Sequence, residues 1–233
     1  MQIHLRRQLR LLRRKKKQNN MSLMNDDDFE LEITSIKEIS GKRRLIYINY
    51  EPAFALYISE IKRFSIKQDS ILDKADYSTI VNDILCKRAR IRAMALLKSR
   101  DYSESGLEKK LKESWYPQEA IENAIDYVKS YGYIDDNRYA ANYIFYHATS
   151  KSRKQIENLL YQKGIPADIV ESECENYYSD NDDVELKQAI KLLNKKLLNK
   201  DKDYENISKA KAYLYRKGFN IDIINKAVLM LEN

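Results

Sequence analysis

One pattern occurs three times in the second part of the 233-residue chain. The segments LEKKLKESWYPQEAIENAI (107–125), IENLLYQKGIPADIVESEC (156–174) and AKAYLYRKGFNIDIINKAV (210–228) align without gaps. Their main apolar positions coincide in three sets: Leu111, Leu160 and Leu214; Tyr116, Ile165 and Phe219; Ile121, Val170 and Ile224. Repeats of about 50 residues are typical of tandem helical units, because each unit buries its apolar face against a neighbour. The sequence therefore predicts a mainly α-helical chain of three-helix repeats in a curved, elongated array.

Each repeat is predicted to consist of two helices, a short turn and a third helix. Gly164 and Gly218 lie where the second helix would end in a left-handed residue, a position that favours glycine. In the first repeat this position holds Trp115. We expect that the helix ends differently there, or that packing of the indole offsets strain of about 1 kcal/mol. The last repeat is longer, which we interpret as a loop insertion at 198–204.

The part of the chain before the repeats has a different texture. Alternation of apolar and polar residues over 29–39, with β-forming residues at 44–49 and 53–57, predicts a small β-hairpin or meander. A helix is predicted to start at 76–78. We therefore divide the chain into a basic disordered tail (1–25), a small segment of short strands and a helix (26–85), and three helical repeats (86–133, 134–182 and 183–233).

The charge of the chain is concentrated at its N-terminal end. Residues 1–20 contain eight basic and no acidic residues. Since the total net charge is +7, the rest of the chain has a net charge of about −1. The high overall charge is therefore no argument for nucleic-acid binding by the folded part. A disordered tail is the preferred interpretation of 1–20; an organelle-targeting peptide, or an upstream extension before a start at Met21 or Met24, are the alternatives.

The residue content predicts neither catalysis nor a cofactor. Two distant cysteines give no disulfide framework or metal-ligand spacing, and with the absence of a long apolar run they favour a cytoplasmic protein without a membrane span. His147 has no ligand-forming neighbours at suitable spacing, and no phosphate-binding loop motif occurs. We interpret Cys86 as a plain thiol despite its basic neighbours, and Asp135-Asp136 as a helix N-cap.

Local clusters of basic residues are the candidate contact sites. Residues 86–112 contain nine basic and three acidic residues, and a second cluster begins at 151. Such clusters can contact a phosphate backbone or an acidic protein surface, or they can simply be solvated helix faces. The residues that we single out for contact with a partner or DNA are Arg88, Arg90, Arg92, Lys98, Arg100, Lys151, Arg153 and Lys154.

Several motifs in a fixed order resemble the RecX family of bacterial regulatory proteins. They include IRAMALLKSRDYSESGLEKKL (91–111), VKSYGYIDDNRYAANYI (128–144) and KSRKQIENLLYQKGI (151–165). The resemblance is close over 88–180 and looser over 181–233, and Trp115 departs from the glycine expected at its position.

The resemblance implies three tandem three-helix units and a role in homologous recombination, DNA repair and the SOS response. It implies binding to the RecA recombinase filament on single-stranded DNA, directly or through the filament, most often with inhibition of ATP hydrolysis and strand exchange. We expect a monomer without enzymatic activity. A helical regulator that binds DNA directly and a helical-repeat adaptor between proteins are the alternative functions.

Overall fold

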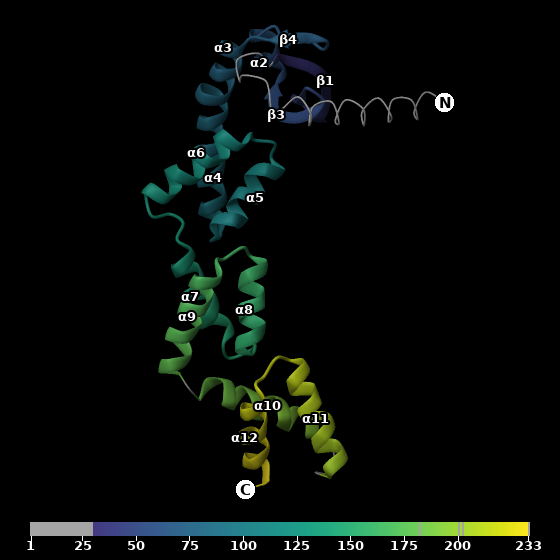
Figure 1. The fold of residues 1–233 in the computed structure, drawn as a ribbon, viewed down its shortest axis with the longest axis vertical. Coiled ribbons are helices and arrows are strands. Elements are labelled where there is room, and N and C mark those ends of the chain that lie inside the picture. The colour runs from purple at the N-terminus through teal and green to yellow at the C-terminus, as the bar shows by residue number, and fades with distance from the viewer. Residues whose placement is uncertain (1–29, 182, 200, 202, 233) are drawn as a thin grey trace, which may run out of the picture. The chain divides into compact units, whose positions relative to one another are not determined.

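The computed structural model describes residues 30–232 apart from 182, 200 and 202. The chain divides between Ser78 and Thr79 into two compact units. The strands belong to the first unit and the three-helix repeats to the second (Figure 1). The predicted basic tail, 1–25, lies outside the described residues.

The first unit contains a four-stranded antiparallel sheet. Its strands are β1 (Leu31–Ser40), β2 (Arg43–Ile48), β3 (Glu51–Tyr57) and β4 (Ser70–Leu72), in the order β3-β2-β1-β4. The alternating pattern places Ile33, Ile46 and Phe54 in the core with no exposed surface. The three strands predicted from this pattern are confirmed. The prediction missed β4, whose three residues pair with the start of β1.

Two short helices complete this unit. Helix α2 (Ile58–Arg63) follows β3 directly, and α3 (Lys74–Thr79) follows β4. The Asp73 carboxylate accepts hydrogen bonds from the N–H groups of Ala75 (2.8 Å) and Asp76 (3.3 Å), so the helix begins before the predicted start at 76–78. The ring of Tyr77 on α3 packs against Phe54 of the sheet, at a centroid distance of 5.9 Å.

The second unit begins with the π-helix η2 (Ile80–Leu85) and then contains three modules. The first module comprises α4 (Cys86–Ser99), α5 (Glu104–Glu113) and α6 (Gln118–Ser130). The second comprises α7 (Asp136–His147), α8 (Arg153–Gln162) and α9 (Ala167–Asp180). The third comprises α10 (Val184–Leu197), α11 (Tyr204–Arg216) and α12 (Ile221–Glu232). The predicted mainly α-helical fold with three-helix repeats is confirmed.

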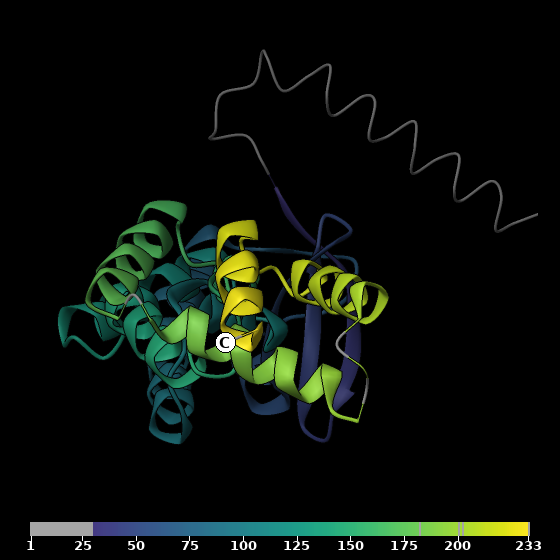
Figure 2. The same ribbon diagram turned by 90° about the horizontal axis from the view of Figure 1, so that it is seen from below.

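The same packing recurs in each module. The first and third helices make the most extensive contact, and the second helix packs against both. In the third module, Figure 2 shows that the third helix, α12, lies across the first helix, α10. The aligned leucines Leu111, Leu160 and Leu214 are fully buried. The repeated apolar pattern therefore encodes one core per module.

The turn between the second and third helices also recurs. Gly164 and Gly218 have φ angles of +77° and +85°, and Trp115 has +65°. In each module two backbone N–H groups of this turn bond back to the end of the second helix. Of the two alternatives for Trp115, a different end of the helix is wrong, because the residue adopts the same left-handed conformation. The other alternative, packing of the indole that offsets the strain, stays a prediction, and 38% of the residue's surface is exposed.

The extra length of the third module is largely helical. Helix α11 has 13 residues where its counterpart α8 has 10, and α10 has 14 where α7 has 12. The described residues between α10 and α11 are not helical, so a loop lies where it was predicted at 198–204. The interpretation that this loop holds the inserted residues is wrong, because most of the extra length lies in the longer helices. The Asp203 carboxylate caps the earlier start of α11 by accepting from the N–H of Asn206 (2.7 Å).

Candidate partner-binding surface

A buried serine links the first and second modules. Ser103 precedes α5, and its hydroxyl accepts a hydrogen bond from the N–H of Gly106 (3.1 Å). The same hydroxyl donates to the carbonyl oxygen of Lys163 in the turn of the second module (2.6 Å). Only 3% of Ser103 is exposed. A helix cap of the first module is thereby joined to the second module.

A carboxylate reinforces this link from the other direction. Asp136, the first residue of α7, accepts a hydrogen bond from the N–H of Glu104 at the start of α5 (2.9 Å). The side chain of Glu104 in turn forms an ion pair with Lys129 (2.8 Å). The predicted N-cap pair at 135–136 thus has two separate roles. Asp135 caps its own helix through the N–H of Arg138 (3.1 Å), whereas Asp136 caps a helix of the preceding module.

The same arrangement links the second and third modules. Ser152 is fully buried; its hydroxyl accepts from the N–H of Gln155 (3.3 Å) and donates to the carbonyl oxygen of Lys217 (2.7 Å). Glu185, near the start of α10, accepts from the N–H of Arg153 (3.2 Å). We call each such set, a serine hydroxyl and a carboxylate at one helix start, a joint. The two joints fix how consecutive modules pack.

Burial affects both joint carboxylates. Each is half-buried, and burial raises the pKa of Asp136 above its ordinary value of 3.8 and that of Glu185 above 4.5. The hydrogen bonds from the backbone N–H groups oppose this rise, because they stabilise the charged form. Keeping the carboxylates of Asp136 and Glu185 charged in the joints therefore costs desolvation free energy.

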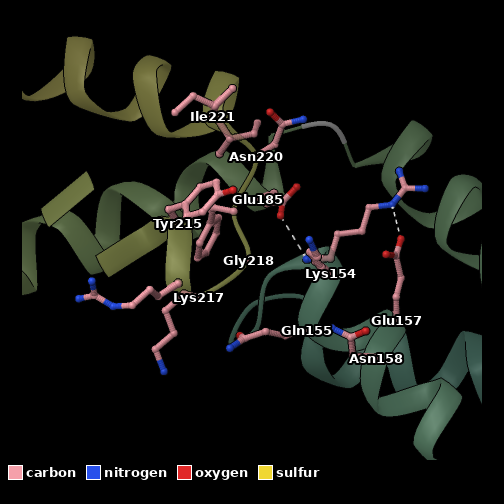
Figure 3. Close-up of a pocket in the computed structure, with 14 residues that line it drawn as sticks. Lys154, Gln155, Glu157, Asn158, Glu185, Tyr215, Lys217, Gly218, Asn220 and Ile221 are labelled. Atoms are coloured by element: carbon pink, nitrogen blue, oxygen red, sulfur yellow. Dashed lines mark hydrogen bonds and ion pairs between the residues drawn. The ribbon is translucent and has the colours of Figure 1, made fainter. Parts of the chain in front are cut away.

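An open groove of about 920 Å³ lies at the second joint (Figure 3). It is formed by the start of α8, the start of α10 and the turn between α11 and α12. Its basic lining residues are Arg153, Lys154, Arg216 and Lys217, and its acidic ones are Glu157 and Glu185. Both acids have contacts with Arg153, the first through its guanidinium (2.9 Å) and the second through its backbone N–H.

The basic residues predicted on the first module lie in two different environments. Arg92, Lys98 and Arg100 are exposed, and the Arg100 guanidinium lies 4.6 Å from the ring centroid of Tyr102. Arg88 and Arg90 are half-buried. Arg90 packs on α6, where its Nε donates to Asn123 (2.7 Å) and its guanidinium lies over the ring of Tyr127. Arg92, Lys98 and Arg100 are therefore the exposed members of this predicted cluster.

The second predicted cluster is also divided. The Lys151 amine lies 3.3 Å from Nδ1 of His147. Burial, together with the positive charge of Lys151, lowers the pKa of the imidazole. Arg153 forms ion pairs with Glu157 (2.9 Å) and Glu175 (3.3 Å), so its charge is largely used within the second module. Lys154 is exposed and lines the groove.

Sequence reasoning missed the basic residues of the recurring turn. Lys163 and Lys217 precede the two left-handed glycines, and Lys217 and Arg216 line the groove. The aligned Lys-Gly pairs in the repeats were the available signal.

Neither cysteine is placed for reactivity, because burial raises the pKa of Cys86 and raises that of Cys174 to about 12. Within the described ranges, no helix has both the length and the apolar character of a membrane span.

Family models match the first and last modules. Residues 89–127 match the model described as "RecX, first three-helix domain", and residues 183–228 match "RecX, third three-helix domain". The last repeat, which resembles the family more loosely in sequence, therefore still matches a domain of that family. Trp115 falls inside the first of these matches.

Curated relatives and solved structures agree with these matches. The regulatory protein RecX of Clostridium perfringens strain SM101 is 30% identical over 212 residues, which cover 87% of this chain and 97% of that protein. The regulatory protein RecX of Caldanaerobacter subterraneus is 29% identical, and the alignment covers 95% of that protein. A crystal structure of regulatory protein RecX shares the fold with a TM-score of 0.57 at 24% identity, over 84% of this chain and 97% of the other. The structure of RecX from Lactobacillus salivarius gives 0.58, also at 24% identity, over 64% and 97%.

Proposed function

The chain belongs to the RecX family of regulatory proteins, and on this ground we propose that it binds the RecA recombinase filament on single-stranded DNA and inhibits it. The expected consequences are slower ATP hydrolysis by RecA and less strand exchange. The observation that carries the proposal is the extent of the similarity. It spans nearly the full length of the relatives and includes the three-helix domains at both ends of the repeat array.

The joints support an action by binding. Each joint connects one module to the next through two side chains, so a contact made by one module also places its neighbour. When contacts belong to one chain, the second binding event is intramolecular and is favoured by a high effective concentration. A protein that binds one state of the filament more tightly than another shifts the filament toward that state.

The exposed basic residues of the first module support an electrostatic contribution. Arg92, Lys98 and Arg100 lie within a segment, 86–112, that has nine basic and three acidic residues. Contacts of such residues with phosphates or an acidic surface release counterions, so added salt weakens the binding. We expect the concentration of this protein needed for half-maximal inhibition of RecA to rise as salt increases.

The test is the rate of ATP hydrolysis by RecA on single-stranded DNA, measured over a titration with the purified protein. We expect the wild-type protein to slow hydrolysis. The triple variant Arg92→Glu, Lys98→Glu and Arg100→Glu should need a higher concentration for the same effect. These three side chains are exposed, so the helical content measured by circular dichroism should stay unchanged.

A matched control separates local contacts from overall charge. Lys191→Glu, Lys195→Glu and Lys226→Glu change the net charge by the same amount at exposed positions of the third module. This control should inhibit RecA nearly as well as the wild type. An unchanged hydrolysis rate with the wild-type protein would contradict the proposed function, and equal losses in both variants would remove the assignment to the first module.

A further inference from the structure

Three tyrosines and an arginine form a continuous stack at the end of the first module. The Arg90 guanidinium lies 5.1 Å from the ring centroid of Tyr127. The Tyr127 ring is 5.0 Å from that of Tyr131, in a tilted arrangement. Tyr131 then stacks on Tyr133 at 5.7 Å, with only 15° between the ring planes. Among the described ring contacts, the stack ends at Tyr133.

The outer two rings of this stack are exposed to solvent. Tyr131 is 60% exposed and Tyr133 is 47% exposed, whereas the helix that precedes them buries its apolar residues. A tyrosine used for core packing would bury its ring and keep only the hydroxyl near the surface. These two residues do not follow that pattern, because each leaves about half or more of its surface exposed to solvent.

The backbone holds the two rings in a defined position. Tyr131 is the C-cap residue of α6, and Gly132 adopts a φ of +65° that turns the chain so that the residues on either side can stack. The Tyr133 N–H donates to the carbonyl oxygen of Val128 (2.9 Å). An Nη of Arg138 donates to the carbonyl oxygen of Gly132 (2.9 Å). The pair is therefore preorganised, so little ordering entropy remains to be lost when a ligand binds.

The space beside the turn is open. A side-chain carbon added at Gly132 would meet no atom within 4 Å. The guanidinium of Arg138 is exposed at the same turn and carries further N–H donors beyond those that hold the backbone. A flat ligand can thus approach the exposed tyrosine pair, with the positive charge of Arg138 held at the adjoining turn.

We propose that Tyr131 and Tyr133 form a stacking platform for the unpaired bases of single-stranded DNA, with Arg138 and Arg90 at its edges. Exposed aromatic rings combined with arginine are the elements by which proteins bind single strands without sequence preference, because every base has a π face. The surplus of basic residues over 86–112 favours a polyanion over an uncharged aromatic ligand. Paired bases of a duplex are stacked already and should not be held in this way.

This inference deepens the proposed function, since it gives the protein a direct contact with the DNA strand, but its test needs no RecA. The measurement is fluorescence anisotropy of a labelled oligodeoxythymidylate titrated with the full-length protein at constant salt. Wild type should bind, and a duplex of equal length should compete poorly. The Tyr131→Ala, Tyr133→Ala variant should bind roughly 5- to 150-fold more weakly, the loss expected for one stacked base.

Further variants separate stacking from other effects of the substitution. Tyr131→Phe, Tyr133→Phe keeps the rings and should bind like the wild type, whereas Tyr131→Leu, Tyr133→Leu keeps apolar bulk and should bind like the alanine variant. The control Tyr146→Ala, Tyr204→Ala removes two rings that are 73% and 90% exposed elsewhere in the second unit, and should leave binding unchanged.

Three results would overturn the platform: no binding of the oligonucleotide by the wild type at low salt, leucine variants as tight as the phenylalanine variants, or equal losses in the control pair. Any of these leaves the inhibition of RecA to be judged by ATP hydrolysis. Conversely, tight oligonucleotide binding without an effect on RecA would contradict the proposed function and leave the platform standing.

Discussion

The two joints share their hydrogen bonds but differ in how closely the surrounding atoms pack. At Gly164, in the first joint, an added side-chain carbon would lie 2.3 Å from the Ser105 hydroxyl oxygen and 2.4 Å from its Cβ. At Gly218, in the second joint, the nearest atoms are the Ser152 hydroxyl at 3.0 Å and the Lys154 Cβ at 3.2 Å. An open groove lies at this second joint. The comparison shows that the polar link is repeated, whereas the tightness of each joint is set by the side chains near its glycine.

The largest expected effect comes from adding a methyl group at the tight joint. Gly164→Ala should lower the free energy of unfolding by about 3 kcal/mol, because a left-handed alanine is strained and the methyl group overlaps Ser105. Gly218→Ala should cost less, about 2 kcal/mol, since its neighbours are farther away. Urea unfolding followed by circular dichroism measures both.

The control for this pair is Gly132→Ala. Gly132 has a left-handed φ of +65° but open space around its Cα, so only the backbone strain of about 1 kcal/mol should remain. Equal losses at all three glycines would show that close packing contributes nothing, and the difference between the joints would then have no energetic meaning.

An intermediate effect is expected from removing the serine hydroxyls. Ser103→Ala and Ser152→Ala each remove a helix cap and a hydrogen bond to a carbonyl oxygen of the next module, at a cost of about 2 kcal/mol. Because the polar link is common to both joints, the two losses should be similar. Thermal unfolding of the two variants compares them directly.

The variant Asp203→Ala separates the effect of losing a helix cap from the effect of losing a hydrogen bond between modules. Asp203 caps α11 through the N–H of Asn206 and lies at an exposed helix start, so its loss should be only about 1 kcal/mol. If the serine variants lost no more than this, the hydrogen bonds from Ser103 and Ser152 to the next module would contribute nothing to stability.

The smallest expected effect is a change in pH dependence. A carboxyl group whose pKa is raised in the folded state stabilises the fold below its unfolded pKa, and this contribution is lost as the pH rises through the folded pKa. Asp136 and Glu185 should therefore make the protein less stable as the pH rises above their ordinary values of 3.8 and 4.5. Asp136→Asn and Glu185→Gln keep an oxygen acceptor and should each flatten this slope.

The pH series has its own control. Glu205→Gln removes one negative charge at an exposed position in the first turn of α11, outside the joints, and so controls for the loss of a single charge. A wild-type stability that rises over this pH range, with the joint variants following the same curve, would contradict the role assigned to burial of these two groups.

The modules were accessible to sequence analysis because their signals are local or repeated. The aligned leucines predicted a repeated helical unit with a buried apolar face, and Leu111, Leu160 and Leu214 are all fully buried. Gly164 and Gly218 predicted the left-handed turns for the same reason. The strand β4 was missed because Ser70–Leu72 is too short to show a period, and its pairing with β1 depends on residues far away in the chain.

The joints could not be predicted, because each side chain acts at a distance. Ser152 caps its own helix through a local contact with Gln155, but its second hydrogen bond reaches Lys217, 65 residues further along. Asp136 resembled half of a local cap and instead serves the helix that begins at Glu104. Arg153 was predicted to contact a partner or DNA, and only the fold shows that it forms ion pairs with Glu157 and Glu175.

We propose that the joined modules bind the filament as one body that contacts more than one RecA subunit. The most direct test is electron cryomicroscopy of the RecA filament on single-stranded DNA, saturated with this protein. We expect connected density for all three modules that extends over at least two neighbouring RecA subunits. Density confined to a single subunit, with the remaining modules away from the filament, would contradict it.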